Sequence, residues 1–151
     1  MSSKRGIFLL GLVTAFVSLF LSVGVASAIA PASVQAGTPA WKSSVLSVGG
    51  SFKNAATVTA TYSVTVQLVR TSTAVKPACT AANNCNSAGT VLNSVTKAYS
   101  VAKSATVSLT ALTVNCPTST TTRYYWAWVK VADSTGKVVT ALSSYIAGKY
   151  C

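Results

Sequence analysis

The stretch "TVTATYSVTVQLV", residues 57–69, decides the fold class. Its even positions from Val58 to Leu68 are apolar, and its odd positions from Thr57 to Gln67 are Thr, Ser or Gln. A strict period of two places the two kinds of side chain on opposite faces of a half-buried strand. Threonine and valine, which alternate here, carry branched β-carbons that suit a pleated surface and restrict rotamers in a helix. We therefore predict a strand over these residues.

Shorter strand signals lie on both sides of this stretch, each bounded by Gly, Pro or Asn-rich segments. No segment of residues 37–151 shows a convincing helical pattern, and a signal helix is expected only at the N-terminus. Six or seven short strands at this spacing predict an all-β fold, an antiparallel β-sandwich. The predicted strands are 43–48, 89–101 (as one or two strands), 104–112, 123–132 and 137–146.

A hairpin turn is predicted at "DSTG", residues 133–136. The carboxylate of Asp133 is suited to hydrogen-bond the turn backbone, and Gly136 is suited to the positive φ of a bulged hairpin. The surrounding stretch "TRYYWAWVKVADSTGKVVTALSS", residues 122–144, resembles the last hairpin of bacterial immunoglobulin-like and fibronectin-III-like surface modules, and "SATVSLTAL", residues 104–112, is similar to the strand before it. The resemblance implies an immunoglobulin-like sandwich, and no functional residues of that family are carried over.

The N-terminus has the features of an export signal. Lys4 and Arg5 precede an uncharged apolar run over 7–25, which leads into small residues. We predict a signal peptide over 1–36, cleaved after Ala36, with cleavage after Ala28 as the alternative. The domain is then 37–151, and its formal charge falls from +11 to +9. A chain of this length forms one domain with a true core.

Two other interpretations of the N-terminus remain open. The apolar run is long enough to span a bilayer, so residues 7–28 are also consistent with an uncleaved membrane anchor. Alternatively, "KRGIFLLG" resembles a type IV pilin leader cut after Gly6, although Gly11 stands where most bacterial pilins carry an acidic residue. In that case the apolar segment would polymerise.

The four cysteines are expected to form disulfides, since export removes the chain from the reducing cytosol. If Asp133 and Gly136 face each other across the turn, Cys151 lies opposite residue 118, close to Cys116. Of the three connectivities, we therefore predict Cys116–Cys151 with Cys79–Cys85. A zinc site is the alternative, but its ligands usually come in closely spaced pairs, and the last two cysteines are single.

The amino-acid composition argues against an enzymatic function. The chain has no His, no Glu and one acid, Asp133, which the turn already uses. The usual general base, paired carboxylates and carboxylate metal ligands are therefore absent. No Ser-Lys or Tyr-Lys pair is singled out by spacing, and there is no glycine-rich phosphate loop. We predict no catalytic activity, no metal and no cofactor.

An aromatic face is predicted on the strand 123–132. One side carries Tyr125, Ala127, Val129 and Val131, which match a core-facing pattern. The other side carries the aromatic side chains. Either a loop, a lysine stem or a neighbouring strand covers the two tryptophans, or they form an exposed binding platform. The candidate platform residues are Arg123, Tyr124, Trp126, Trp128 and Lys130.

Charge suggests the kind of partner. Ten basic residues against one acid in 37–151 produce a diffuse positive field, without the basic stripe expected for specific nucleic-acid binding. We expect a secreted, extracellular, non-enzymatic surface or binding module that acts on an anionic cell-envelope polymer or glycan. The alternatives are a self-assembling structural subunit, pilin-like or filamentous, and a small secreted toxin or bacteriocin-like effector. Membrane contact is expected only if the signal helix is retained.

Overall fold

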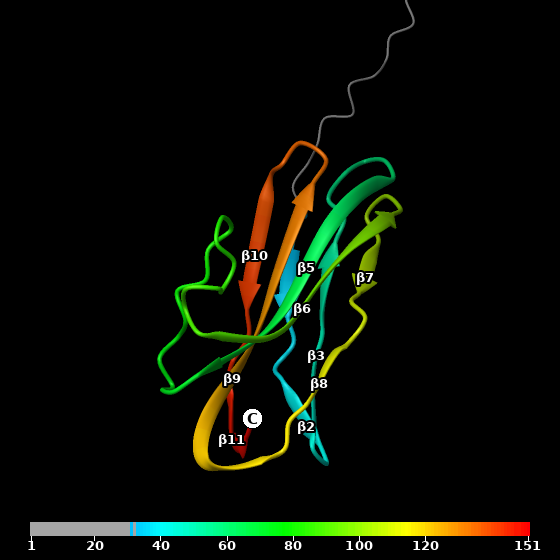
Figure 1. Ribbon diagram of the computed structural model, residues 1–151. Helices are drawn as coiled ribbons and strands as arrows, with labels where there is room; N and C mark the ends of the chain where they lie inside the picture. Colours follow the sequence, from blue (N-terminus) through cyan, green and yellow to red (C-terminus); the bar gives the residue numbers. More distant parts are fainter. Residues whose placement is uncertain (1–30, 32) are drawn as a thin grey trace, which may run out of the picture.

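The structure, a computed structural model, describes residue 31 and residues 33–151. The predicted signal peptide, anchor and pilin leader lie largely outside these residues and stay predictions. Every regular element in the described part of the chain is a β-strand, and all the strand pairs are antiparallel (Figure 1). The strands are β1 (Ser33–Ala36), β2 (Ala40–Lys42), β3 (Val45–Val48), β4 (Gly50–Lys53), β5 (Ala60–Thr71), β6 (Thr90–Val101), β7 (Thr106–Ser108), β8 (Leu112–Asn115), β9 (Thr118–Asp133), β10 (Val138–Leu142) and β11 (Ile146–Tyr150).

The first layer is a five-stranded sheet built around β9, which is 16 residues long. One edge of β9 pairs with β10 and β11 in succession, so that Leu142 lies opposite Trp128 and Ile146 opposite Tyr125. The other edge pairs with β5, and β6 pairs with the far side of β5. Figure 1 shows β10 and β11 following one another along β9.

The second layer consists of two three-stranded sheets that continue one another, in the orders β1-β4-β7 and β2-β3-β8. Only Gly49 separates β3 from β4. Two main-chain hydrogen bonds span the joint, from Gly37 N to Gly49 O at 2.8 Å and from Leu109 N to Gly50 O at 2.9 Å. The two sheets therefore act as one layer of three strand columns.

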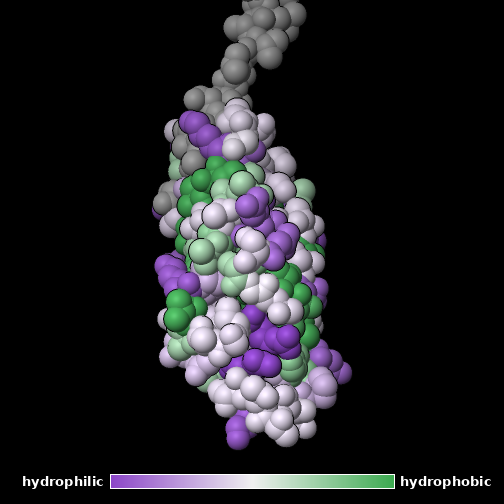
Figure 2. All heavy atoms as spheres, turned by 60° about the vertical axis from the view of Figure 1, so that its left-hand side comes forward, coloured by the Kyte–Doolittle hydropathy of each residue, from purple (hydrophilic) through white to green (hydrophobic). Residues whose placement is uncertain are grey.

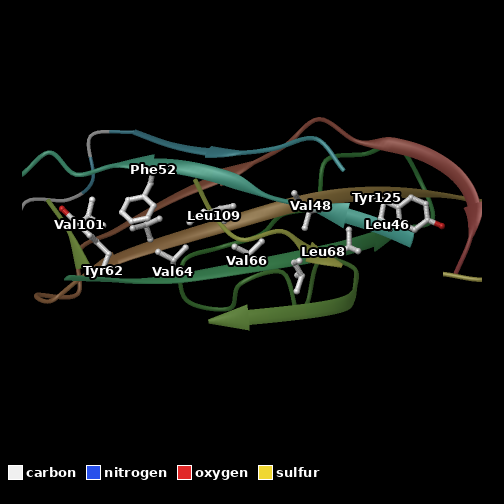
Figure 3. Packing of buried hydrophobic residues seen from close by; sticks show 14 of the residues in the cluster. Leu46, Val48, Phe52, Tyr62, Val64, Val66, Leu68, Val101, Leu109 and Tyr125 are labelled. Atoms are coloured by element: carbon white, nitrogen blue, oxygen red, sulfur yellow. The ribbon is translucent and has the colours of Figure 1, made fainter. Parts of the chain in front are cut away.

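The core lies between the two layers. The inward face of β5 contributes its even-numbered apolar side chains, and β9 contributes its odd-numbered ones, as expected from the sequence. The second layer faces them with Leu46, Val48 and Phe52. Figure 3 shows these side chains in a row along the sandwich, with Phe52, Tyr62 and Val101 at one end and Leu46, Leu68 and Tyr125 at the other. The structure is thus an all-β sandwich.

Several local predictions are confirmed. Gly136 has a φ of 82°, and Asp133 Oδ1 accepts hydrogen bonds from the main chain of Thr135 at 2.8 Å and of Lys137 at 2.9 Å. The disulfides join Cys79 to Cys85 and Cys116 to Cys151.

Other boundaries differ from the prediction. The predicted strand 104–112 is two strands, because its column changes partner from β4 to β3 where Leu109 bonds to Gly50. Strand β5 begins at Ala60 rather than residue 57, and Val58 is exposed. Strand β1 precedes Gly37, the expected first residue of the domain, so the sandwich described here includes residues 33–36.

Candidate anion-binding pocket

The outer face of β9 is covered by the connection between β5 and β6, residues 72–89. Trp126 and Trp128 lie on this face, and only 5% and 1% of their surfaces are exposed. They form a second apolar cluster with Val69 and Cys85. This burial corrects the expectation of an exposed tryptophan platform and agrees with the alternative in which a loop covers both rings. The segment is visible in Figure 1 as the loop that projects to the side of β10.

Polar side chains of the sheet hold this loop in place. The amide of Cys85 donates to Gln67 Oε1 at 3.0 Å, and Lys130 Nζ donates to Asn84 Oδ1 at 2.8 Å. The same ammonium group lies 5.9 Å from the centre of the Trp128 ring, a favourable cation–π distance. Lys130, predicted as part of a platform, therefore fastens the loop over the tryptophans. Two polar odd positions of β5, Thr65 and Gln67, are likewise buried.

The two remaining platform candidates lie on different sides of the sheet. Tyr124 is half-buried, and its ring packs edge-on against Tyr145 with 5.3 Å between the ring centres. Arg123 is also half-buried, but it lines a separate cavity of about 570 Å³. The structure thus separates the five candidates: three pack under or beside the loop, Tyr124 meets Tyr145, and Arg123 faces the cavity.

This cavity is lined by the end of β5, both ends of the β5–β6 connection, the first residue of β6 and one residue of β9. Three basic side chains contribute to it: Arg70, Lys76 and Arg123. The rest of the wall consists of hydroxyl groups and small apolar residues, from Thr71, Ser72, Thr73, Val75, Pro77, Ala78, Ala88, Gly89 and Thr90. We call it the cationic pocket.

The C-terminal end of β11 fixes the position of Arg70. Its Nη1 donates to the main-chain oxygen of Cys151, and the neighbouring Tyr125 hydroxyl donates to the main-chain oxygen of Tyr150. The disulfide Cys116–Cys151 ties this end of the chain to the start of β9. Arg70 is therefore oriented by the strand end, the disulfide and the sheet together.

Both arginines act electrostatically on Tyr125. Burial raises the pKa of this phenol, while the hydrogen bond to Tyr150 and the positive charges of Arg70 and Arg123 lower it, and the net shift is upward. The two guanidinium groups therefore lie close enough to the same hydroxyl for their charges to reach it. In the described chain, the side chain of Arg123 makes no hydrogen bond or ion pair.

No acidic side chain balances the pocket. The one acid of the sequence, Asp133, lies in the β9–β10 turn, eight positions along β9 from Tyr125, which is roughly 26 Å away at strand spacing. Desolvation raises the pKa of Asp133, but hydrogen bonds from Thr135 and Lys137 and the charge of Lys137 outweigh it, and the net pKa is lowered. This carboxylate therefore already accepts hydrogen bonds within the β9–β10 turn.

Gly89 is needed where the connection returns to the sheet. A β-carbon there would lie 2.8 Å from the Arg70 carbonyl oxygen and 2.9 Å from Val69 Cγ1. Such distances are shorter than real contacts, so only glycine lets the loop approach β5 this closely. Sequence reasoning missed Arg70, Lys76 and Gly89. One signal was present for Arg70. It is the next even position after Leu68, so it places a charge where the alternating pattern predicts an inward apolar side chain.

Two further findings limit the chemistry of the described residues. No group of three or more His, Cys, Asp or Glu side chains in residues 31 and 33–151 lies close enough to hold a metal ion. A search of the same residues for a helix with the length and apolar character to cross a membrane found none.

Comparison with known proteins gives little further constraint. No protein-family model matches the sequence, and no curated protein matches it. A β-glucuronidase of Bacteroides uniformis aligns over 78% of this chain with 17% identity and a TM-score of 0.47. CsgH of R. palustris aligns over 74% of this chain and 92% of its own, with 12% identity and a TM-score of 0.40. The present chain spans only 13% of the glucuronidase chain.

Proposed function

We propose that this protein is a secreted, non-enzymatic binding module that recognises an anionic cell-envelope polymer or glycan through the cationic pocket. The observation that carries the proposal is the pair Arg70 and Arg123: both are half-buried, both line one cavity, and no carboxylate side chain of the described chain lies near them.

The physical argument concerns a partly buried charge that has no partner in the described chain, that of Arg123. A half-buried guanidinium group loses part of its hydration, which costs free energy unless an anion or acceptor replaces the lost water. Arg123 has no such acceptor within residues 33–151. A carboxylate, sulfate or phosphate group fits the planar fork of donors of an arginine and forms charge-assisted bonds worth about 1.5–3 kcal/mol each.

The other parts of the proposal are supported by residue content and strand order. The absence of His and Glu from the sequence and the engagement of Asp133 support a non-enzymatic role. The two disulfides support an extracellular location. A three-column layer facing the order β10-β9-β5-β6 supports the immunoglobulin-like, fibronectin-III-like type suggested by residues 122–144.

The test compares binding of the folded domain, residues 29–151, with that of two single variants. Arg123→Gln removes the charge that has no partner in the described structure. Lys103→Gln removes one equivalent charge beyond the far end of β6, roughly 40 Å along the strand from Thr90. With polygalacturonate and polyphosphate as probes in titration calorimetry, Arg123→Gln should weaken binding about tenfold or more, and Lys103→Gln less than twofold. Equal weakening would mean that the diffuse field binds, and the pocket would be discarded.

A self-assembling subunit is the second candidate, favoured by one observation. The outer edge of β6 pairs with no strand in the described chain along its 12 residues, and Lys97 is the one charged residue on that strand. Long edges with few charges are open to pairing with another chain. Sedimentation of the purified domain distinguishes the candidates: a monomer at high concentration removes this one.

A further inference from the structure

One exposed aromatic ring lies on the outer face of β9, the face that carries Trp126. Tyr145, in the short connection between β10 and β11, has 42% of its surface exposed, whereas the neighbouring Trp126 is buried. The Tyr145 ring packs against Trp126, with 5.1 Å between ring centres, and against Tyr124. The large apolar side chains exposed elsewhere in the described chain are valines.

The connection that carries Tyr145 is fixed to the sheet. The amide of Ser143 donates to the Ala127 oxygen at 2.9 Å, and the Ala127 amide donates to Ser143 Oγ at 2.8 Å. Ser143 Oγ in turn donates to the Ser144 oxygen at 2.6 Å. The tyrosine is therefore held in place before any ligand arrives, which reduces the entropy cost of binding.

Hydrogen bonds join Trp126, on which the Tyr145 ring packs, to the pocket wall. Trp126 Nε1 donates to Thr71 Oγ1 at 3.0 Å, and Thr71 Oγ1 donates to the Thr73 oxygen at 2.7 Å. Thr71 and Thr73 both line the cationic pocket, and Thr71 lies opposite Tyr124 in the β5–β9 ladder. Tyr145 is thus one indole ring away from a residue of the pocket wall.

We propose that Tyr145 and the cationic pocket form one extended site for an acidic polysaccharide: the pocket holds the anionic group, and Tyr145 supports an adjoining sugar ring. This inference rests on the proposed function and names the ligand class for the same site. The C–H face of a sugar ring is apolar and packs on an aromatic face, while its hydroxyls suit the Thr and Ser side chains of the pocket wall.

A nucleic acid also combines anionic groups with flat rings, but it fits the arrangement less well. Single-stranded nucleic acids are bound by several aromatic platforms spaced along a basic groove. Here, Trp126 and Trp128 are under the β5–β6 connection, which leaves Tyr145 as the one well-exposed aromatic ring of the described residues. Figure 2, which brings the left-hand side of Figure 1 forward, shows strongly hydrophilic residues in separate patches with paler residues between them.

The test uses ligands that separate charge from rings. Polygalacturonate has anionic groups on sugar rings, polyphosphate has anionic groups alone, and oligothymidylate is the nucleic-acid probe. Tyr145→Ala should weaken polygalacturonate binding about five- to tenfold and change polyphosphate binding less than twofold. Tyr145→Phe, which keeps the ring, should bind polygalacturonate within about twofold of the unaltered chain.

Each other result overturns the proposal in a distinguishable way. If Arg123→Gln weakens binding but Tyr145→Ala does not, the pocket stands and the extended site is wrong. If oligothymidylate binds more tightly than polygalacturonate and loses affinity with Tyr145→Ala, the ligand is a nucleic acid and the polysaccharide assignment is wrong. If polygalacturonate does not bind the unaltered chain, the extended site is wrong. If none of the three probes binds, the proposed function fails with it.

Discussion

The hydroxyl of Tyr62 donates a hydrogen bond to Oδ1 of Asn54 at 2.6 Å, at a point where both side chains are fully buried. Asn54 follows β4, and Tyr62 lies in β5, so this bond connects the two layers of the sandwich. The asparagine also accepts from the Ala56 amide, and its amide group donates to the main-chain oxygens of Val58, Val101 and Ala102.

Replacing Asn54 should destabilise the fold strongly. Asn54→Ala leaves the Tyr62 hydroxyl and the Val101 oxygen buried without this partner, and we expect a loss of about 2–4 kcal/mol in the free energy of unfolding. Asn93→Ala, at an exposed position of β6, should cost less than about 1 kcal/mol. Urea denaturation followed by circular dichroism measures both. Similar losses would show that the buried hydrogen bonds of Asn54 contribute no more to stability than the exposed ones of Asn93.

The tryptophans under the β5–β6 connection should behave as core residues. Trp128→Ala should cost about 3–5 kcal/mol, because its ring is 1% exposed and the loop above it cannot fill the cavity. Val138→Ala, at a partly exposed position of the adjacent β10, serves as the control and should cost less than about 1 kcal/mol. A Trp128→Ala protein that melts like the unaltered chain would contradict the described packing.

The two disulfides should have different effects when removed. The Cys116–Cys151 bond has a sequence separation of 35, and its loss by double serine substitution should cost about 4 kcal/mol by the loop-entropy estimate. The Cys79–Cys85 bond, with a separation of 6, should cost about 2 kcal/mol by the same estimate. Its removal should also loosen the loop over Trp126 and Trp128, seen as increased acrylamide quenching of tryptophan fluorescence. Unchanged quenching would show that the Cys79–Cys85 disulfide is not needed to keep the loop over the two tryptophans.

The residues before Gly37 should contribute to stability. In β1, Val34 and Ala36 pack against the core, and the strand pairs with β4 along Ser33–Ala36. Gly50 permits this contact, since a β-carbon there would collide with the Gln35 oxygen. The free energy of unfolding of a chain starting at Gly37 should therefore be at least about 1 kcal/mol lower than that of a chain starting at Ile29. Cleavage after Ala36 stays a prediction, and N-terminal sequencing of the secreted protein decides between Gly37 and Ile29.

Stability should depend weakly on pH between about 5 and 8, because the chain has no histidine and one acidic side chain. The lowered pKa of Asp133 in the folded state means that its contribution is present above the unfolded pKa and is lost as pH falls through the folded pKa. Asp133→Asn should remove this acid-side loss in thermal melts over a pH series. An unchanged acid-side loss in that variant would assign it to another group.

The alkaline limit has the opposite sign. Burial raises the pKa of Tyr62 above its ordinary value of 10.0, so this phenol contributes stability that is present below the unfolded pKa and is lost as pH rises through the folded pKa. Alkaline unfolding should therefore accompany ionisation of Tyr62. The variant Tyr62→Phe also loses the hydrogen bond to Asn54, so its stability at neutral pH serves as the reference. Relative to that reference, its alkaline unfolding transition should shift to higher pH.

Features that depend on local chemistry could be predicted from the sequence. The alternation in β5 follows from side chains on opposite faces of one strand, and the turn at Asp133–Gly136 follows from the conformational preferences of its own residues. The hairpin then led to the Cys116–Cys151 pairing.

Features that depend on distant packing could not. Whether Trp126 and Trp128 are exposed is decided by the connection 72–89, whose fold is set by Cys79–Cys85 and by bonds to Gln67 and Lys130. The cationic pocket likewise depends on the register between β5 and β9, which brings Arg70 and Arg123 to one end of the sheet. The two strands are far apart in the sequence, so no local sequence pattern predicts that register.

The length of β9 has a consequence for how the protein folds. Its pairing with β10 and β11 joins residues at most 32 positions apart (Tyr150 and Thr118), whereas its pairing with β5 joins Tyr62 to Asp133 across about half of the chain. Contacts of such high sequence separation slow folding, because a long loop must close before they form. Strands β5 and β6 therefore have no completed sheet to join until β9 has been synthesised. A chain interrupted before Thr118 should expose two long strand edges and aggregate, so the segment from Thr118 onward controls when folding of the whole domain begins.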